Sequence, residues 1–336
     1  MDISIPYYED NSRISNSSLG WFIQSPRYFR DRLDGKVEEK PTSAMENGTM
    51  VHMYLLQPEE FKKTYKVLSF QTPTSQQQKK FCEDYIASTK NKPILRALEA
   101  FKNNYSTTGR SDEDNGKKGL EMALKLKHYI KFLRENKNGT KVISWAELET
   151  LKKIKENVLL HKMARELLLN NPNSANFKAE NEFHINWEWI TYKDAFTEEK
   201  LLCKSLVDRI IIDHDNKVIK LIDIKTTVSV ANFSSSFKEY DYGRQMSFYW
   251  FAIRWYLEID QKIDLSDYAA ETYIIAIQNN RGGECRVYRV DESILVEKAK
   301  EIKNILSEID WHKKENLWDF SKEYYQGDGA ESLKYD

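Results

Sequence analysis

Residues 204–227 form the segment that most limits what this chain can fold into. They read KSLVDRIIIDHDNKVIKLIDIKTT, a pattern typical of a β-hairpin with two apolar strands. Asp208 lies on the first strand, and Asp223 and Lys225 lie on the second. Because side chains alternate between the faces of a strand, Asp223 and Lys225 point to the same face. Apolar flanks of this kind are typical of central strands, so charged residues among them indicate a function.

The chemistry of these residues suits the hydrolysis of phosphodiester bonds. A divalent metal can polarise the phosphate, lower the pKa of an attacking water and stabilise the leaving oxygen. Magnesium prefers oxygen ligands, which Asp208, Asp223 and the carbonyl of Ile224 could supply. We expect Lys225 to orient or deprotonate the water, with a pKa depressed by burial. The alternative is structural: two acids that cap strand ends and a solvated strand lysine.

Composition excludes several other classes of protein. The 336 residues carry a net charge of only −1, so no overall basic field attracts nucleic acid. The three cysteines, Cys82, Cys203 and Cys285, are too few and too scattered for a disulfide framework, a zinc knuckle or an iron–sulfur cluster. No apolar run has the length of a membrane span, and no signal-peptide core is visible at the N-terminus. These features predict a cytoplasmic protein without a membrane partner.

Periodicity divides the chain into regions within one predicted domain, residues 1–336. Residues 14–66 are helical and contain the motif G-x-x-x-H. Residues 74–137 are polar, lysine-rich and helical, like an insertion, whereas residues 142–314 alternate between helical and strand patterns. The fold class predicted is α/β, with a mixed central sheet flanked by helices and an N-terminal helical region.

Four further residues accompany the hairpin acids. Glu182 lies on the preceding predicted strand and could join a metal site directly or through water; it could equally be an exposed strand residue. His52 follows Gly48 by four positions on a helix, where a lone histidine is more often structural. Gln245 and Tyr249, at i and i+4, share a helix face and could contact the site, or could form the polar edge of a core-facing helix.

The ordered series G-x-x-x-H, E, D, D-x-K and Q-x-x-x-Y resembles the PD-(D/E)XK nuclease superfamily, which has a restriction-endonuclease-like core. The closest resemblance is to its RecB-like branch, which holds the RecE-type and lambda-type phage exonucleases. It is carried by the strings SNSSL, SPRYF, GTMVHMYLLQPEEF, CKSLVDRI, LIDIKTT and YDYGRQMSFY, over residues 14–66 and 142–260. Two features depart from the pattern: Val207 replaces the usual proline, and Lys204 and Leu206 stand where related proteins often have arginines.

The resemblance implies a role for each site residue. It implies one metal held by His52, Asp208, Asp223 and the Ile224 carbonyl, with Glu182 nearby. The metal expected is Mg²⁺, for which Mn²⁺ substitutes. It also implies Lys225 as the catalytic lysine, with Gln245 and Tyr249 positioning the substrate or that lysine. Candidates for contact with DNA phosphate are Ser17, Ser18, Arg27, Lys204 and Arg244. Ser17 and Ser18 could instead be simple helix caps.

The function that follows is a deoxyribonuclease, a hydrolase that degrades linear duplex DNA from an end in phage-type recombination or end resection. By resemblance its partners are DNA ends, a single-strand annealing protein and further copies of itself in a trimeric or tetrameric ring, inside a bacterial or phage-infected cell. Two alternatives stay open: a structure-specific endonuclease on the same fold, and a non-catalytic DNA-binding scaffold. The insertion at 74–137 could be an oligomer contact, a DNA guide, a docking arm or a solvated elaboration.

Overall fold

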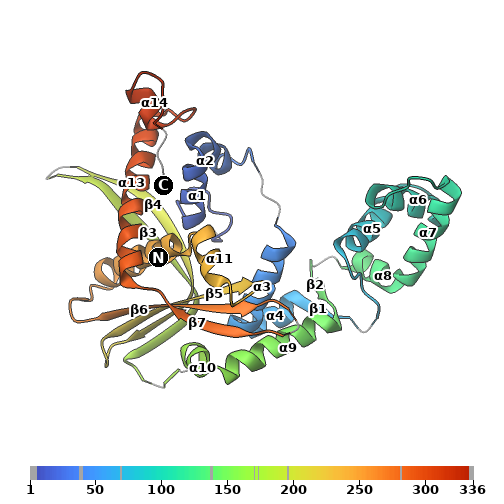
Figure 1. Ribbon diagram of the computed structural model, residues 1–336, viewed down its shortest axis with the longest axis horizontal. Coiled ribbons are helices and arrows are strands. Elements are labelled where there is room, and N and C mark those ends of the chain that lie inside the picture. The colour runs from blue at the N-terminus through green and yellow to red at the C-terminus, as the bar shows by residue number, and fades with distance from the viewer. Residues whose placement is uncertain are drawn as a thin grey trace. The chain divides into compact units, whose positions relative to one another are not determined.

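A computed structural model describes residues 6–37, 41–68, 70–136, 139–169, 171–172, 174–194, 197–280 and 282–332. The chain divides into two compact units (Figure 1). The first consists of residues 1–56 and 153–336, and the second of residues 57–152. The predicted insertion, 74–137, lies inside the second unit, which extends beyond it on both sides.

A mixed five-stranded sheet forms the centre of the first unit (Figure 1), as the sequence predicted. Its order is β3-β4-β5-β6-β7. The strands are β3 (Phe177–Lys193), β4 (Glu198–Asp213), β5 (Val218–Thr227), β6 (Ala269–Gln278) and β7 (Cys285–Arg289). Neighbours are antiparallel except β5 and β6, which run parallel. Most of β5 is buried on both faces, which explains its nearly continuous apolar sequence.

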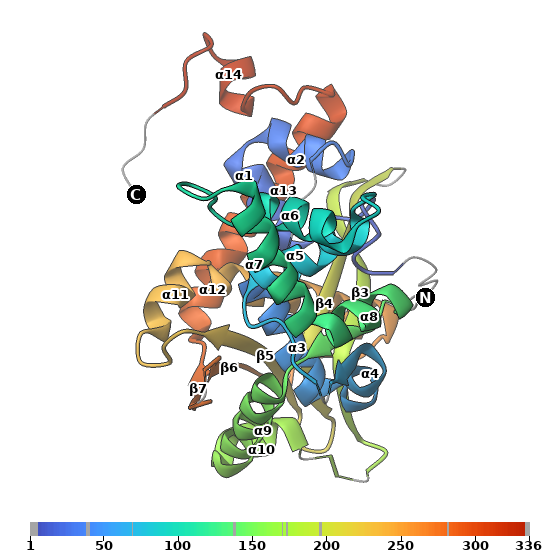
Figure 2. The same ribbon diagram turned by 90° about the vertical axis from the view of Figure 1, so that its right-hand side faces the viewer.

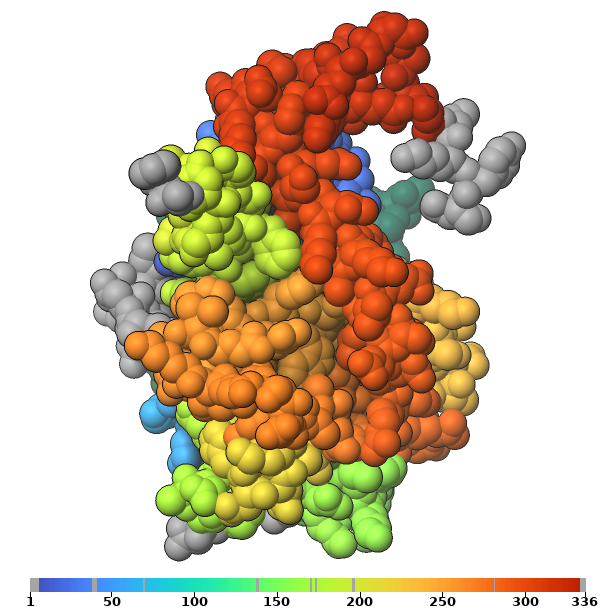
Figure 3. All heavy atoms as spheres, turned by 90° about the vertical axis from the view of Figure 1, so that its left-hand side faces the viewer, coloured from blue at the N-terminus to red at the C-terminus, as the bar shows by residue number. Residues whose placement is uncertain are grey.

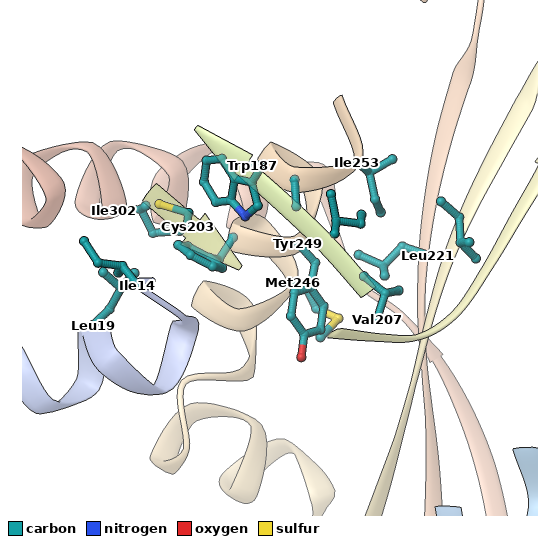
Figure 4. Close-up of a cluster of buried hydrophobic side chains, with 14 of the residues drawn as sticks. Ile14, Leu19, Trp187, Cys203, Val207, Leu221, Met246, Tyr249, Ile253 and Ile302 are labelled. Atoms are coloured by element: carbon teal, nitrogen blue, oxygen red, sulfur yellow. The ribbon is translucent and has the colours of Figure 1, made fainter. Parts of the chain in front are cut away.

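The parallel pair β5–β6 requires a crossover, and helices supply it (Figure 2). The crossover contains α11 (Phe233–Glu239), α12 (Tyr242–Arg254) and a π-helical turn, η1 (Trp255–Asp260). The helix that begins at Tyr242 therefore changes its winding after Arg254. Apolar residues of α12 face β3 and β4, where the ring centroids of Phe248 and Trp187 lie 5.0 Å apart. Figure 4 shows Met246, Tyr249 and Ile253 of α12 in this core.

Helices from both ends of the chain, together with α10 from its middle, complete the first unit. They are α1 (Asn16–Gln24), α2 (Pro26–Leu33), α3 (Ser43–Leu56), α10 (Lys162–Leu169), α13 (Glu292–Glu315) and α14 (Lys322–Gln326). Pro26 begins α2, where its missing N–H has no consequence. The α13 helix lies alongside the β3–β4 hairpin (Figure 3), and Lys314 forms an ion pair with Glu199 of β4. No helix within the described residues is long and apolar enough to span a bilayer.

The second unit is mostly helical and has a core of its own, around Phe81, Phe101 and Ile130. Its elements are α4 (Pro58–Thr64), β1 (Tyr65–Val67), α5 (Gln76–Ala87), α6 (Pro93–Asn104), α7 (Asp112–Lys125), α8 (Lys127–Glu135) and β2 (Lys141–Ile143). β1 and β2 pair in parallel. The α9 helix (Trp145–Leu160) begins in this unit and ends in the first. His161 separates α9 from α10.

Gly119 of α7 lets the backbone of α6 approach closely. A Cβ atom there would fall 2.4 Å from the carbonyl oxygen of Ala97, whereas one at Gly116, a turn earlier, would meet Ile94 at 3.5 Å. We predict that Gly119→Ala lowers the free energy of unfolding by about 1–3 kcal/mol through overpacking. Gly116→Ala is the matched control and should leave stability unchanged or raise it, because alanine favours helix. Urea unfolding followed by circular dichroism measures both; equal effects would contradict the packing argument.

Candidate metal centre

Glu182 and Asp208 lie opposite each other on neighbouring strands. The β3–β4 register pairs Asn181 with Arg209 and Phe183 with Val207, which leaves Glu182 facing Asp208 between them. Directly opposed residues of an antiparallel pair share a face and lie close together. Glu182 has a φ of +50°, a left-handed conformation that is uncommon for a residue with a side chain. Strain of this kind gathers at functional sites, where surrounding structure maintains it.

The β4–β5 ladder ends where the acids begin. Its last pair in this direction is Arg209 with Ile222, so the same register would place Asp208 opposite Asp223 next. Instead, the backbone N–H of Ile224 donates a hydrogen bond of 2.6 Å to Oδ2 of Asp208. A side-chain carboxylate thus replaces a ladder partner. Because N–H and C=O of one strand residue point to the same edge, the Ile224 carbonyl also faces β4, where the predicted metal site lies.

His52 reaches the same carboxylate from α3. Its Nδ1 lies 3.4 Å from Oδ2 of Asp208. Gly48, one turn earlier, faces β5: a Cβ there would lie 3.4 Å from Oγ1 of Thr226, an ordinary contact distance, so α3 packs closely on this strand. Burial alone would lower the pKa of His52, but Asp208 raises it above its ordinary value. The spacing G-x-x-x-H thus places Gly48 against β5 one turn before His52.

Three side chains offer converging metal-ligand atoms. One atom each from His52, Glu182 and Asp208 lies within 4.8 Å of the others. Burial and the neighbouring Asp208 raise the pKa of Glu182 to about 7. Burial also opposes ionisation of Asp208, but His52 reverses the effect and leaves its pKa lowered. Carboxylate oxygens with one imidazole suit a divalent cation such as Mg²⁺ or Mn²⁺, and a cation would relieve the repulsion between the acids.

The converging ligands differ from the predicted ligands at two acids. Glu182, which was expected near the metal, is one of the converging ligands. Asp223, which was expected to bind the metal, instead forms an ion pair with Lys225, whose Nζ lies 2.7 Å from Oδ2. Burial, followed by the neighbouring Asp208, raises the pKa of Asp223 to about 6. The charge of Asp223 contributes to the raised pKa of Glu182, so Asp223 lies close to the three converging ligands. Asp223 thus links the metal-ligand cluster to the lysine.

The expected depression of the Lys225 pKa was wrong. Burial does act to lower it, but Asp223 and Asp208 outweigh burial, and the pKa of Lys225 is raised. The side chain is therefore an ammonium group in this arrangement. An ammonium cannot accept a proton from water, so Lys225 can act as a positive charge and a hydrogen-bond donor.

Gln245 and Tyr249 both reach the site from α12. Nε2 of Gln245 donates to the Tyr249 hydroxyl at 2.8 Å and lies 3.4 Å from Oδ1 of Asp223. The i, i+4 spacing thus produces one hydrogen-bonded chain that ends on the acid. Burial raises the pKa of Tyr249 well above its usual range, so its hydroxyl stays protonated. Gln245, itself bonded to Tyr249, thus contacts the Asp223 carboxylate on the oxygen that Lys225 leaves open.

Sequence reasoning missed Tyr242, which begins α12. Nζ of Lys225 lies 4.9 Å from the centroid of its ring, within the range of a cation–π interaction. Phe233 stacks on the ring of Tyr242 at 5.9 Å. The ammonium therefore has Asp223 and an aromatic ring as partners. The sequence did contain a signal for this residue: Tyr242 precedes Gln245 by three residues and therefore shares its helix face.

A second missed feature is the buried Arg209, beside Asp208 on β4. Its guanidinium donates to the Leu167 carbonyl at 2.7 Å, to Oδ1 of Asn181 at 2.6 Å and to Oδ1 of Asn171 at 2.7 Å. Asn181 in turn donates to the carbonyl of Leu56, the last residue of α3. This network ties the helix that carries His52 to the strands that carry Glu182 and Asp208.

Of the phosphate-contact candidates, Ser18 is buried and forms a capping box with Ser15. Its interpretation as a helix cap is thereby supported. Ser17 is exposed in the first turn of α1. The Nε of Arg244 donates to Oδ1 of Asn16 at 3.2 Å, which places this arginine at the N-terminus of α1. Ser17 and Arg244 are thus close in the fold and remain candidates.

The other two candidates are engaged in other contacts. Arg27 is exposed on α2. Its Nε lies 3.9 Å from Oδ2 of Asp31, and its Nη1 lies 3.7 Å from Oδ1 of Asp319. Lys204 is buried, and its ammonium donates to two backbone carbonyls, so it does not present a charge to DNA. The prediction of a phosphate contact by Lys204 is therefore withdrawn.

The charges of the site predict an unusual dependence of stability on pH. Glu182 and Asp223 have pKa values raised to about 7 and about 6, above those of an unfolded chain. Their protonated forms favour folding. This contribution is fully present below the pKa values of the unfolded chain, about 4, and is lost as the pH rises through the folded values, to about 7. We expect Mg²⁺ to raise the melting temperature most at the upper end of this range, because protons and metal compete for the same oxygens.

Thermal melting with magnesium and with a chelator measures this difference across pH. Glu182→Gln removes one titrating ligand, so it should reduce both the metal-induced increase and its pH dependence. Glu188→Gln, on the same strand beside Lys200, is the control and should behave as the wild type. An increase that is equal at all pH values would contradict the assignment of these acids.

Comparison with known proteins agrees with the fold. A family model described as a PDDEXK-like domain of unknown function (DUF3799) matches residues 15–164, which include His52. The crystal structure of a "putative exonuclease" from Eubacterium rectale is similar at 12% sequence identity and a TM-score of 0.50. That alignment covers 100% of this chain and 95% of the other, and therefore includes the strands beyond residue 164. None of the curated proteins compared with the chain matches it. The chain thus has the fold of the PD-(D/E)XK nuclease superfamily, as the sequence resemblance predicted.

Proposed function

We propose that this protein is a magnesium-dependent deoxyribonuclease that degrades linear duplex DNA from an end. One observation carries the proposal: ligand atoms of His52, Glu182 and Asp208 converge beside the Asp223–Lys225 pair. The site thus combines a place for a cation with an ammonium group fixed next to it. Both are needed to neutralise the charge that develops when a phosphodiester is attacked.

Each residue has a distinct task in this mechanism. A bound Mg²⁺ would polarise the scissile phosphate and lower the pKa of the attacking water. Lys225, protonated because Asp223 and Asp208 outweigh burial, donates hydrogen bonds to the phosphate or the water and offsets negative charge. Asp223 holds Lys225 in place, and Gln245 contacts the other oxygen of that carboxylate. His52 and Asp208 hold each other in position through the contact between Nδ1 and Oδ2.

The choice of an exonuclease depends on the sequence resemblance and on the description of the Eubacterium rectale structure, which concerns that protein. The same resemblance suggests recombination or end resection as the setting. It also suggests an annealing protein as partner and a ring of several copies, with Mn²⁺ substituting for Mg²⁺. Sedimentation of the protein with and without DNA would test the ring. A monomer under both conditions would remove it from the proposal.

The decisive experiment compares linear with covalently closed duplex DNA in the presence of magnesium. Loss of linear DNA alone, from labelled ends inward, supports the exonuclease. Cutting of closed circles would establish an endonuclease on the same fold. Absence of cleavage in both magnesium and manganese would favour a DNA-binding scaffold.

Lys225→Ala should lower the cleavage rate by about 100-fold or more, the usual effect of removing one group that stabilises transition-state charge. Lys220→Ala is the matched control, because Lys220 lies on the same strand and pairs with Glu166 and Glu271, away from the metal ligands. Single-turnover cleavage rates and DNA-binding affinities are measured for both variants. Equal rates would remove Lys225 from the mechanism.

Tyr242→Leu should lower the single-turnover rate roughly 2- to 30-fold, which corresponds to a cation–π interaction of about 0.5–2 kcal/mol with Lys225. Tyr242→Phe keeps the ring and should retain most of the rate. A comparable loss in both variants would show that the hydroxyl, and not the ring, is what matters.

A further inference from the structure

The segment before α1 is attached to β4 as an added piece of sheet. The N–H of Ile14 donates to the Leu202 carbonyl at 2.9 Å, and the N–H of Lys204 donates to the Ile14 carbonyl at 2.8 Å. This parallel bridge uses the edge of β4 that β5 leaves open beyond Arg209. The segment is therefore held at the point where the sheet separates.

Lys204 fixes the turn that precedes this bridge. Its ammonium donates to the carbonyls of Tyr7 and Asp10, both at 2.5 Å, and lies 4.6 Å from the ring of Tyr7. A buried ammonium is costly unless it is hydrogen-bonded, so these contacts strongly favour one conformation of the turn. The N–H groups of Glu9 and Asp10 both donate to the carbonyl of Pro6 and close the turn.

The turn presents Tyr8 to solvent. The side chain of Tyr8 is 83% exposed, whereas Tyr7 points inward and its ring contacts the ring edge of Tyr8 at 5.1 Å and of His184 at 5.3 Å. A ring that is exposed on a constrained turn pays little conformational entropy when it binds a flat partner.

The turn lies on the face of the sheet that carries the metal ligands. His184 pairs with Leu206 on β4, and the opposed Glu182 and Asp208 are the next residues along on the same face. Neighbouring positions on one face are about 6.8 Å apart along a strand. The charges of Glu182 and Asp208 act on the phenol of Tyr8, which places it within electrostatic reach of the candidate metal centre.

We propose that Tyr8 positions the substrate by stacking its ring on a base next to the phosphate held at the metal centre. This inference rests on the proposed nuclease function. Aromatic side chains stack on bases of any sequence, which suits an enzyme that degrades DNA progressively. The residues beneath the turn supply the constraint, and Tyr8 supplies the contact.

Steady-state kinetics distinguish this role from a structural one. Tyr8→Leu should raise KM roughly 5- to 100-fold, the range expected for loss of one base–aromatic stack, with little change in kcat. Tyr8→Phe keeps the ring and should resemble the wild type. Tyr192→Leu is the matched control, because Tyr192 is 49% exposed near the far end of β3. Equal losses in the phenylalanine and leucine variants would overturn the stacking role, as would a fall in kcat with KM unchanged.

A fluorescence measurement tests the contact without cleavage. DNA carrying 2-aminopurine at each of the terminal positions in turn is added to Lys225→Ala protein with calcium. Stacking on Tyr8 should quench the probe at one or two positions. The quenching should persist with Tyr8→Phe and disappear with Tyr8→Leu, each introduced into the Lys225→Ala background.

Quenching that is unaffected by Tyr8→Leu would overturn the inference. If the wild type cleaves no DNA, the proposed function fails, but the quenching experiment still decides whether Tyr8 contacts a base. Magnesium-induced stabilisation of Tyr8→Leu should equal that of the wild type. A loss of that stabilisation would assign Tyr8 to the integrity of the metal centre and would also overturn the inference.

Discussion

The hydrogen bond from the Ile224 N–H to the Asp208 carboxylate is the interaction on which this site depends. It replaces the next step of the β4–β5 ladder, which ends at Arg209 and Ile222. Two strands that stayed paired would direct their backbone groups at each other. Because they separate here, a carboxylate, a backbone carbonyl and the adjacent strand residues can face a common space. The apolar remainder of both strands anchors the hairpin in the core and keeps the separation local.

Charge balance explains why the neighbouring groups occur together. Asp208, Asp223 and Glu182 are buried or half-buried, and each opposes ionisation of another. His52 and Lys225 offset part of this repulsion, which leaves the pKa of Asp208 lowered and that of Lys225 raised. The remaining excess of negative charge favours a cation. Lys225 therefore belongs to the electrostatic structure of the site before any substrate arrives.

Two buried basic residues, Arg209 and Lys204, hold the chain's early segments against the sheet. Arg209 and Asn181 connect to the end of α3, whereas Lys204 binds the turn at residues 6–10. Under the proposed nuclease function, basic residues beside the candidate metal-binding acids invite assignment as phosphate contacts. Their burial shows that backbone carbonyls and amide side chains are their partners instead. Arg244, at the N-terminus of α1, is also mostly buried and contacts Asn16 and Asp241.

The sequence by itself determined the hairpin, the mixed sheet, the crossover helix and the residue types of the site, because alternation, capping and i, i+4 spacing are local properties. It therefore placed Asp223 with Lys225, and Gln245 with Tyr249. Only the tertiary structure decided that Glu182 converges with His52 and Asp208, that the pKa of Lys225 is raised, and that Lys204 is internal. These properties depend on strand register and on the sum of distant charges and burial, which arise when segments far apart in the chain pack together.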